Sequence, residues 1–157
     1  MGLEDGAKSL FTYQNQLVHG LMQTDDYAAA AIRAAQPAAS ADEVQCQIAA
    51  RATRQALLTA ANPLQVWAVL DEAVLRRHVG GPTPCGRSWT VSGRLQRSPN
   101  VTLEVLPFDA GAHASMGTSF EPLQFPEPGD TAIVYIEDQT QPVSGDRRRH
   151  RAVYAGL

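Results

Sequence analysis

The sequence predicts an α+β fold in which N-terminal helices pack on a mainly antiparallel sheet of about four strands. Two observations carry this prediction. Helical periodicity and capping residues dominate a first part, residues 3–62, whereas short β-rich runs between turn residues dominate a second part, residues 64–138. Residues 139–157 are interpreted as an irregular basic tail. The length of 157 residues suits a single domain, 1–157, with a core of its own.

The first two helices are predicted from residue spacing and from end signals. In the segment LEDGAKSLFTYQNQLVHGLMQT, Leu10, Tyr13 and Leu17 recur at the spacings of one helix face. The segment TDDYAAAAIRAAQP then begins at the N-cap candidate Thr24, and its two aspartates suit the positive end of a helix dipole. Pro37 ends this second helix, so two helices are expected before residue 38.

The third helix has the strongest signal of the first part. Ser40 and Glu43 have the spacing of a capping box, and the Asn62-Pro63 pair ends the segment. An apolar row follows the cap at helical spacing: Val44, Ile48, Ala52 and Ala56. We therefore expect one long helix over this segment.

Four short runs in the second part are predicted as strands. The run LQVWAVL is rich in β-branched and aromatic residues and changes into a short helix at Asp71 and Glu72. In NVTLEVLPF the residues Val101, Leu103 and Val105 point one way. The runs TSFEPLQFPEPGD and TAIVYIED supply the remaining strands, the first of which ends in turn residues.

Composition disfavours several classes of protein. A net charge of -3 argues against a dedicated nucleic-acid binder, and the basic run RRRHR at 147–151 is interpreted as a solvated tail. No apolar run of about 18 residues and no leader peptide occur, so we expect a cytoplasmic protein without a membrane span. Cys46 and Cys85 form neither a disulfide framework nor a metal-ligand spacing, and no motif for a cofactor is present.

Several polar and aromatic residues are candidates for a site, although no catalytic constellation emerges. His113 lies on a glycine-rich loop, and Glu72 lies at a strand-to-helix junction. The candidate ligand-binding residues are Trp67, Glu72, His113 and Phe120. For an enzyme, the polar groups to test are His113, Glu72 and Tyr135. Each residue also has a structural interpretation: Glu72 paired with Arg76, His113 exposed on its loop, and the aromatic residues in the core.

Several segments in order resemble a known family. They are LVHGLMQTDDYAAAAIRA, ARATRQALL, VLDEAVLRRHVGG, PNVTLEVLPFDAGAHASMGTSFEPLQFPEP and IVYIED. Together they resemble the uncharacterised C-terminal domain of actinobacterial helix-turn-helix regulators of the XRE type, some of which are described as antitoxin-like. His19 stands where that family usually has proline. The family's DNA-binding helix-turn-helix does not precede the domain here, so the resemblance implies a sensor or partner-binding half.

Residues 82–98 depart from this resemblance. The family carries an amphipathic helix there, whereas PTPCGRSWTVSGRLQRS contains glycine and β-branched residues and has no apolar stripe. One choice of codons for these residues encodes the family's helix when it is translated in another reading frame. We therefore hypothesise a compensated frameshift, natural or a sequence error, with a similar event at 141–151. A loop or a broken helix is expected at 82–98.

Two functions from different classes follow. The first is a non-catalytic domain, derived from an XRE-type regulator, that binds a small molecule or a small partner protein in a groove between helices and sheet. Direct nucleic-acid binding by this chain is not expected. A homodimer is a possible oligomeric state. The alternative is a stand-alone domain recruited as a small-molecule biosynthetic enzyme, such as a cyclase or isomerase, whose pocket accelerates a reaction by orienting its substrate.

Overall fold

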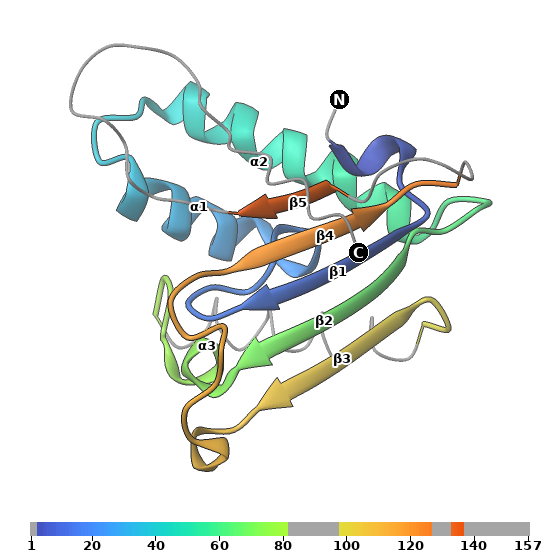
Figure 1. Cartoon of the computed structure of the whole chain (residues 1–157). Coiled ribbons are helices and arrows are strands. Elements are labelled where there is room, and N and C mark those ends of the chain that lie inside the picture. Colours follow the sequence, from blue (N-terminus) through green and yellow to red (C-terminus); the bar gives the residue numbers. More distant parts are fainter. Residues whose placement is uncertain (1–2, 82–97, 127–132, 137–157) are drawn as a thin grey trace.

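The computed structural model describes residues 3–81, 98–126 and 133–136 of the chain. Within these ranges the backbone forms one five-stranded sheet, in the order β3-β2-β1-β4-β5 (Figure 1). The strands are β1 (Ser9–Gln14), β2 (Gln65–Asp71), β3 (Val101–Leu106), β4 (Phe120–Gln124) and β5 (Ile133–Ile136). Strand β1 therefore lies at the centre of the sheet, although it comes first in the chain.

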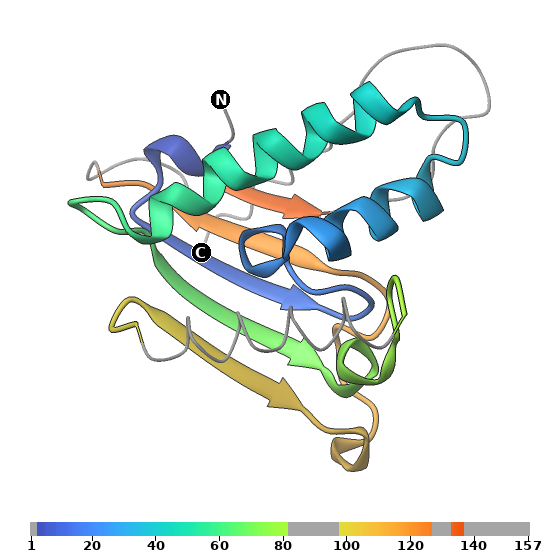
Figure 2. The ribbon, with the colours of Figure 1, turned by 180° about the vertical axis from the view of Figure 1, so that it is seen from behind.

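Helices cover one face of this sheet. In Figure 2 the two long helices lie in front of the strands, and α3 lies at the end of β2. The α-helices in the described part of the chain are α1 (Asp25–Ala35), α2 (Ala41–Gln55) and α3 (Glu72–Arg76). The short 3-10 helices there are η1 (Leu3–Gly6), η2 (Gly20–Met22), η3 (Ala56–Leu58) and η4 (Phe108–Ala110).

The predicted α+β class is confirmed, and the sheet is mixed. Strand β1 pairs in parallel with β2, and β2 pairs in parallel with β3. The pairs β1–β4 and β4–β5 are antiparallel. The parallel pair β1–β2 is joined by α1 and α2, because a crossover connection must return the chain to the same end of the sheet. The sheet is therefore mixed because β1, the first strand in the chain, pairs in parallel with β2 on one side and antiparallel with β4 on the other.

Residues 9–14 form the central strand β1, so the helix expected from Leu10, Tyr13 and Leu17 is wrong. In so short a segment, spacings of three and four also fit a strand that continues into a loop. Leu10 lies opposite Leu123 of β4, and Tyr13 lies opposite Phe120. Pairing on both edges of β1 satisfies its backbone groups, and this tertiary context overrides the weak helical pattern.

The starts of α1 and α2 are as the sequence predicts. The side chain of Thr24 accepts a hydrogen bond from the backbone N–H of Tyr27 and caps α1. Ser40 and Glu43 form the complete capping box of α2. Because each cap satisfies backbone donors that lack a partner within the helix, these local signals fix where the helices begin.

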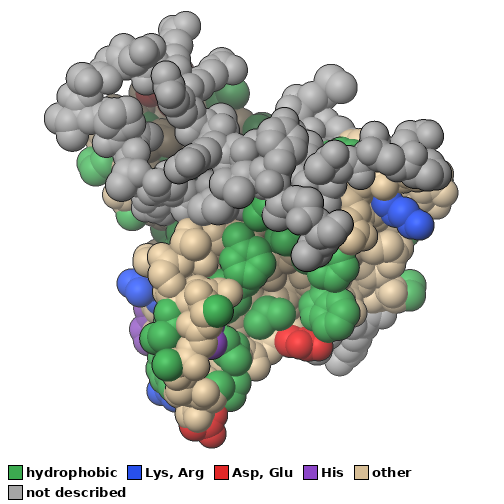
Figure 3. All heavy atoms as spheres, in the orientation of Figure 1, with side chains coloured by type: hydrophobic (Ala, Val, Ile, Leu, Met, Phe, Trp, Pro, Cys, Tyr) green, Lys and Arg blue, Asp and Glu red, His purple; other side chains and the backbone are tan. Residues whose placement is uncertain are grey.

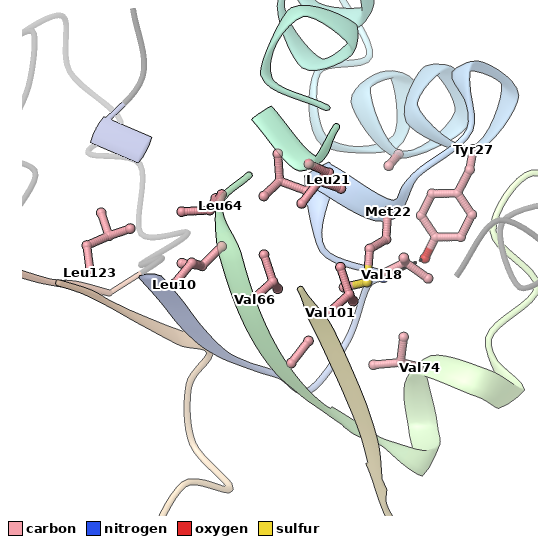
Figure 4. Close-up of a cluster of buried hydrophobic side chains, with 13 residues drawn as sticks. Leu10, Val18, Leu21, Met22, Tyr27, Leu64, Val66, Val74, Val101 and Leu123 are labelled. Carbon is pink, nitrogen blue, oxygen red and sulfur yellow. Dashed lines mark hydrogen bonds between the residues drawn. The ribbon is translucent and has the colours of Figure 1, made fainter. Parts of the chain in front are cut away.

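The main hydrophobic core lies between the sheet and the helices. Figure 4 shows its side chains converging from the strands, from η2 and from α1. Tyr27 of α1 is fully buried, and its hydroxyl accepts a hydrogen bond from the backbone N–H of Val18, at 3.1 Å. This contact ties the first long helix to the loop after β1. A second, smaller cluster joins α1 to α2 through Ala28, Ile32, Val44 and Ile48.

Several predictions fall outside the described residues. They are the loop or broken helix at 82–98, the basic tail at 139–157, and Cys85. Of the first segment, only residue 98 belongs to the described residues. Cys46, the other cysteine, is a free and exposed thiol on α2. No helix in the described ranges is long and apolar enough to cross a membrane.

Candidate functional site

A pocket of about 390 Å³ lies between the sheet and the two long helices. Its walls come from η1, the end of β1, η2, α1, α2 and β4. Aliphatic side chains such as Leu17, Ile32 and Ala35 line part of it. The polar residues that matter for its chemistry are Glu4, Gln14, His19, Gln23, Arg54 and Glu121. An apolar wall with a few polar groups is the usual composition of a small-molecule site.

His19 is a buried residue in the wall of this pocket. It precedes η2, and its Nδ1 accepts a hydrogen bond from the backbone N–H of Leu21, at 3.3 Å. Because Nδ1 is an acceptor, Nε2 carries the ring proton. Nε2 lies 3.0 Å from Oε1 of Glu121 and therefore donates to this carboxylate. The His19 side chain is only 2% exposed, so the contact is almost fully shielded from water.

Glu121 brings a carboxylate into the interior from β4. Burial raises the pKa of this carboxyl, but the hydrogen bond and the charge of His19, the positive charge of Arg54 and the hydrogen bond from Gln14 together hold the pKa below its usual value. The Gln14 bond runs from Nε2 to Oε1 of Glu121, at 3.1 Å. Glu121 is therefore ionised at neutral pH and serves as an acceptor for two neighbouring side chains.

Oε1 of Gln23 and Nε of Arg54, in two residues that line the pocket, have almost no accessible surface and no hydrogen-bond partner in the described part of the chain. Gln23 is only 7% exposed, and its Nε2 donates to the carbonyl oxygen of Val18, at 2.6 Å. Arg54 forms an ion pair through Nη2 with Glu4. A buried polar atom without a partner costs free energy, so these two atoms lower the stability of the folded chain.

The wall that carries these two atoms is held rigidly. Nε2 of Gln55 donates to the carbonyl oxygens of Gly20, at 3.2 Å, and of Gln23, at 2.7 Å. These bonds tie the end of α2 to η2. This wall of the pocket therefore joins elements whose relative position is fixed, which reduces the ordering cost of binding.

The predicted site residue His113 lies against the opposite face of the sheet. Its Nε2 is 3.3 Å from the hydroxyl oxygen of Tyr13, and the two rings meet edge to face with centroids 5.5 Å apart. The Tyr13 hydroxyl donates its one proton to Oδ2 of Asp71, at 3.2 Å, so His113 is the donor to Tyr13. Burial, followed by the charge and the hydrogen bond of Asp71, raises the pKa of Tyr13 to about 12.

The other predicted residues only partly join this group. Phe120 packs on the Tyr13 ring, with centroids 5.8 Å apart, so Tyr13 brings His113 and Phe120 together. Trp67 packs instead on Phe11, at 6.0 Å, and 47% of its surface is exposed. Figure 3 shows hydrophobic side chains gathered on this face of the sheet.

Glu72 is engaged elsewhere. Its Oε1 accepts a hydrogen bond from Nε of Arg76, at 2.7 Å, and its Oε2 accepts one from the backbone N–H of Phe108, at 2.9 Å. The Phe108 bond and then the Arg76 bond lower the pKa of Glu72. The structural interpretation of Glu72 as a partner of Arg76 is thus confirmed, and no contact joins Glu72 to His113 among the described hydrogen bonds and ion pairs.

Tyr135, the third residue to test in an enzyme, lies on β5. Its backbone pairs with Glu121 of β4, whereas Phe120 pairs with Ile136. The side chain of Tyr135 lies outside the described residues. The roles of Trp67, Glu72, His113 and Phe120 in binding stay predictions.

Sequence reasoning missed the pocket residues that are joined across the fold. The His19–Glu121 contact joins the loop after β1 to β4. One signal was present, because His19 replaces the proline of the resembling family. A second signal was Glu121, which lies two residues before the apolar Leu123 in the same short strand. A carboxylate on the core face of a strand needs a partner. Neither signal identifies the partner without the sheet register.

Replacing His113 with alanine is expected to lower the free energy of unfolding by about 1 kcal/mol, because one partly exposed hydrogen bond and one aromatic contact are lost. Chemical denaturation measures this change. The matched control is Tyr13→Phe, which keeps the ring and removes the hydroxyl, and the double variant gives the coupling energy. Additive single effects would contradict a direct His113–Tyr13 contact.

Metal ligation has no support in the described part of the chain, where no group of three or more histidine, cysteine, aspartate or glutamate side chains could hold an ion. The arrangement in the pocket instead suits a molecule that forms hydrogen bonds. Its fixed groups are an ionised carboxylate, the histidine that donates to it and an arginine in an ion pair.

Comparisons with known proteins identify a family but no activity. A family model described as a domain of unknown function, DUF5753, matches residues 1–157, and the chain therefore belongs to this family. No curated protein matches the chain. No solved structure matches it either.

Proposed function

We propose that this chain is a non-catalytic binding domain, derived from an XRE-type regulator, that holds a small molecule in the pocket between helices and sheet. The observation that carries the proposal is the pocket of about 390 Å³ itself, whose wall combines aliphatic side chains such as Leu17 and Ile32 with polar ones such as Gln14 and Glu121. A ligand that fills it stabilises the folded chain by mass action.

Protonation states argue against some acid–base groups. Effective general acids and bases have pKa values near the working pH. The pKa of Glu121 and that of Glu72 are both lowered, whereas the pKa of Tyr13 is raised to about 12. Each of these three groups therefore holds one protonation state near neutral pH, which removes Glu72 from the candidate acids and bases of the cyclase or isomerase alternative.

The sequence-predicted site is a second location for a ligand or for a small partner protein. Trp67 is half exposed there, and His113 and Phe120 flank Tyr13. We place the small molecule in the pocket because it offers an enclosed volume of about 390 Å³ between helices and sheet, whereas His113 and Tyr13 already satisfy each other. The two locations lie on opposite faces of the sheet, so one experiment separates them.

The test is a titration of the isotope-labelled chain with four small probes, followed by backbone amide NMR. The probes are acetamide, acetate, methylguanidinium and 2-pyrrolidinone, which represent neutral, anionic, cationic and lactam chemistry. At least one probe is expected to shift the amides of Leu21, Gln23 and Arg54 in a saturable way. Shifts confined to Trp67 and His113, or no saturable shift with any probe, would contradict the proposed function.

A further inference from the structure

We propose that His19 is a proton-operated switch in the wall of the pocket. The neutral ring holds the 3-10 helix η2, whereas the protonated ring releases η2 and keeps its contact with β4. The effect of this switch on a ligand rests on the proposed function, because it requires that the pocket binds one. The effect on η2 does not, and it can be measured without any ligand.

The neutral ring uses its two nitrogen atoms in opposite ways. Nδ1 accepts a hydrogen bond from the backbone N–H of Leu21, at 3.3 Å, and this bond is the side-chain cap of η2. Nε2 lies 3.0 Å from Oε1 of Glu121 and donates to it. A neutral imidazole has one acceptor and one donor, so it satisfies both partners at once.

Protonation reverses only one of these two contacts. An imidazolium ring carries a proton on each nitrogen atom, so Nδ1 becomes a donor that faces another donor, the Leu21 N–H. The bond to Glu121 keeps its direction and becomes charge-assisted, which makes it stronger. The added proton therefore detaches His19 from η2 and tightens its contact with β4.

Burial gives this change a structural consequence. The His19 side chain is only 2% exposed, so water cannot simply replace the lost partner. Two facing donors in such a place cost free energy, and the ring or η2 has to move to separate them. Gln55 still holds the carbonyl oxygens of Gly20 and Gln23, so the movement stays local. Because His19 and Gly20 line the pocket, the movement alters its wall.

The charged groups around the ring favour different protonation states. Glu121 of β4 is ionised and favours the protonated ring. Arg51 and Arg54 of α2 line the same pocket and oppose a further positive charge, although Glu4 of η1 offsets part of this by its ion pair with Arg54. The residues that β1 and α1 contribute to the pocket wall carry no charge. The cap of η2 and the arginines thus act against Glu121, and both forms of His19 are accessible.

The test is a pH titration of the isotope-labelled full chain from about pH 8 to about pH 5, the range in which histidines ordinarily titrate. Nitrogen NMR spectra of the ring report the protonation of His19, and hydrogen exchange reports the protection of the Leu21 amide. As the ring becomes protonated, the protection factor of this amide is expected to fall about fivefold. A ring that keeps one protonation state, or an amide whose protection does not follow the ring, would overturn the switch.

Two histidine variants supply a matched comparison. His19→Asn keeps an acceptor for the Leu21 N–H but has no titratable ring, so the fall in protection with pH should disappear. His78→Asn changes an exposed histidine outside the pocket and should show the same fall as the unchanged chain. A fall that persists in His19→Asn would assign the effect to another group and overturn the switch.

A ligand titration distinguishes the switch from the proposed function. 2-Pyrrolidinone is expected to bind the unchanged chain about fivefold more weakly at pH 5 than at pH 8, since a ligand that fits the neutral form opposes protonation. Equal affinity at the two pH values would overturn the control of the pocket by His19 but not the proposed function. If none of the four probes shifts the pocket amides at either pH, the proposed function fails, and the Leu21 protection factor still decides whether His19 switches η2.

Discussion

Replacing Glu121 with alanine is expected to lower the free energy of unfolding by about 3 kcal/mol. The Glu121 side chain is 13% exposed and accepts hydrogen bonds from His19 and Gln14. Its removal leaves the His19 Nε2–H buried without a partner and opens space in the pocket wall. Denaturation by urea, followed by far-UV circular dichroism, measures the change.

Two further variants separate the carboxylate from the β4 backbone. Glu121→Gln keeps the shape of the side chain and one acceptor, so its loss should be smaller than that of Glu121→Ala. Glu104→Ala changes an exposed glutamate on β3, and its effect should stay within about 0.5 kcal/mol. Equal effects of Glu121→Ala and Glu104→Ala would mean that the buried contact contributes nothing.

The same carboxylate makes stability depend on pH in the acidic range. The folded chain holds the pKa of Glu121 below its ordinary value of 4.5. The stabilisation is therefore complete above that value and is lost as the pH falls through the lower folded-state pKa. Lowered pKa values of Glu43 and Glu72 act in the same window, so the informative quantity is the difference between the unchanged chain and Glu121→Gln. This difference should shrink as the pH falls below about 4.5.

Replacing Leu10 with alanine is expected to lower the free energy of unfolding by about 3 kcal/mol. Leu10 is fully buried at the centre of the sheet, where β2 and β4 flank β1. Figure 4 places it beside Val66 and Leu64 within the main core. The substitution leaves a cavity that the paired strands on both sides cannot close. The same denaturation experiment measures the loss.

Met116→Ala is the control for this substitution. Met116 is 60% exposed, so shortening its side chain should change the free energy of unfolding by no more than about 0.5 kcal/mol. A loss for Leu10→Ala as small as that control would contradict the assignment of residues 9–14 to the central strand.

Local signals in the sequence predicted the helix starts and most of the strands. The Thr24 cap and the Ser40–Glu43 capping box need only their own neighbours, and the structure has both. The strand-to-helix change at Asp71 is likewise local, since the Asp71 side chain accepts a hydrogen bond from the backbone N–H of Ala73. Such features depend on a few adjacent residues and can therefore be read directly from the chain.

The central strand and the pocket depend on distant partners. Leu10 and Tyr13 share helical spacing, and only pairing with β2 and β4 makes their segment a strand. The His19–Glu121 contact needs η2 and β4 to meet across the core. His113 was singled out as a candidate site residue, but Tyr13 had been assigned to a helix, so their contact could not be foreseen.

The most direct test of the central claim is a crystal structure of the full chain with 2-pyrrolidinone. The claim is that the pocket between helices and sheet is the ligand site of this DUF5753 domain. The ring is expected to lie in the pocket, against Leu17 and Ile32. A lactam bound instead beside Trp67 and His113, with the pocket free of it, would contradict the claim.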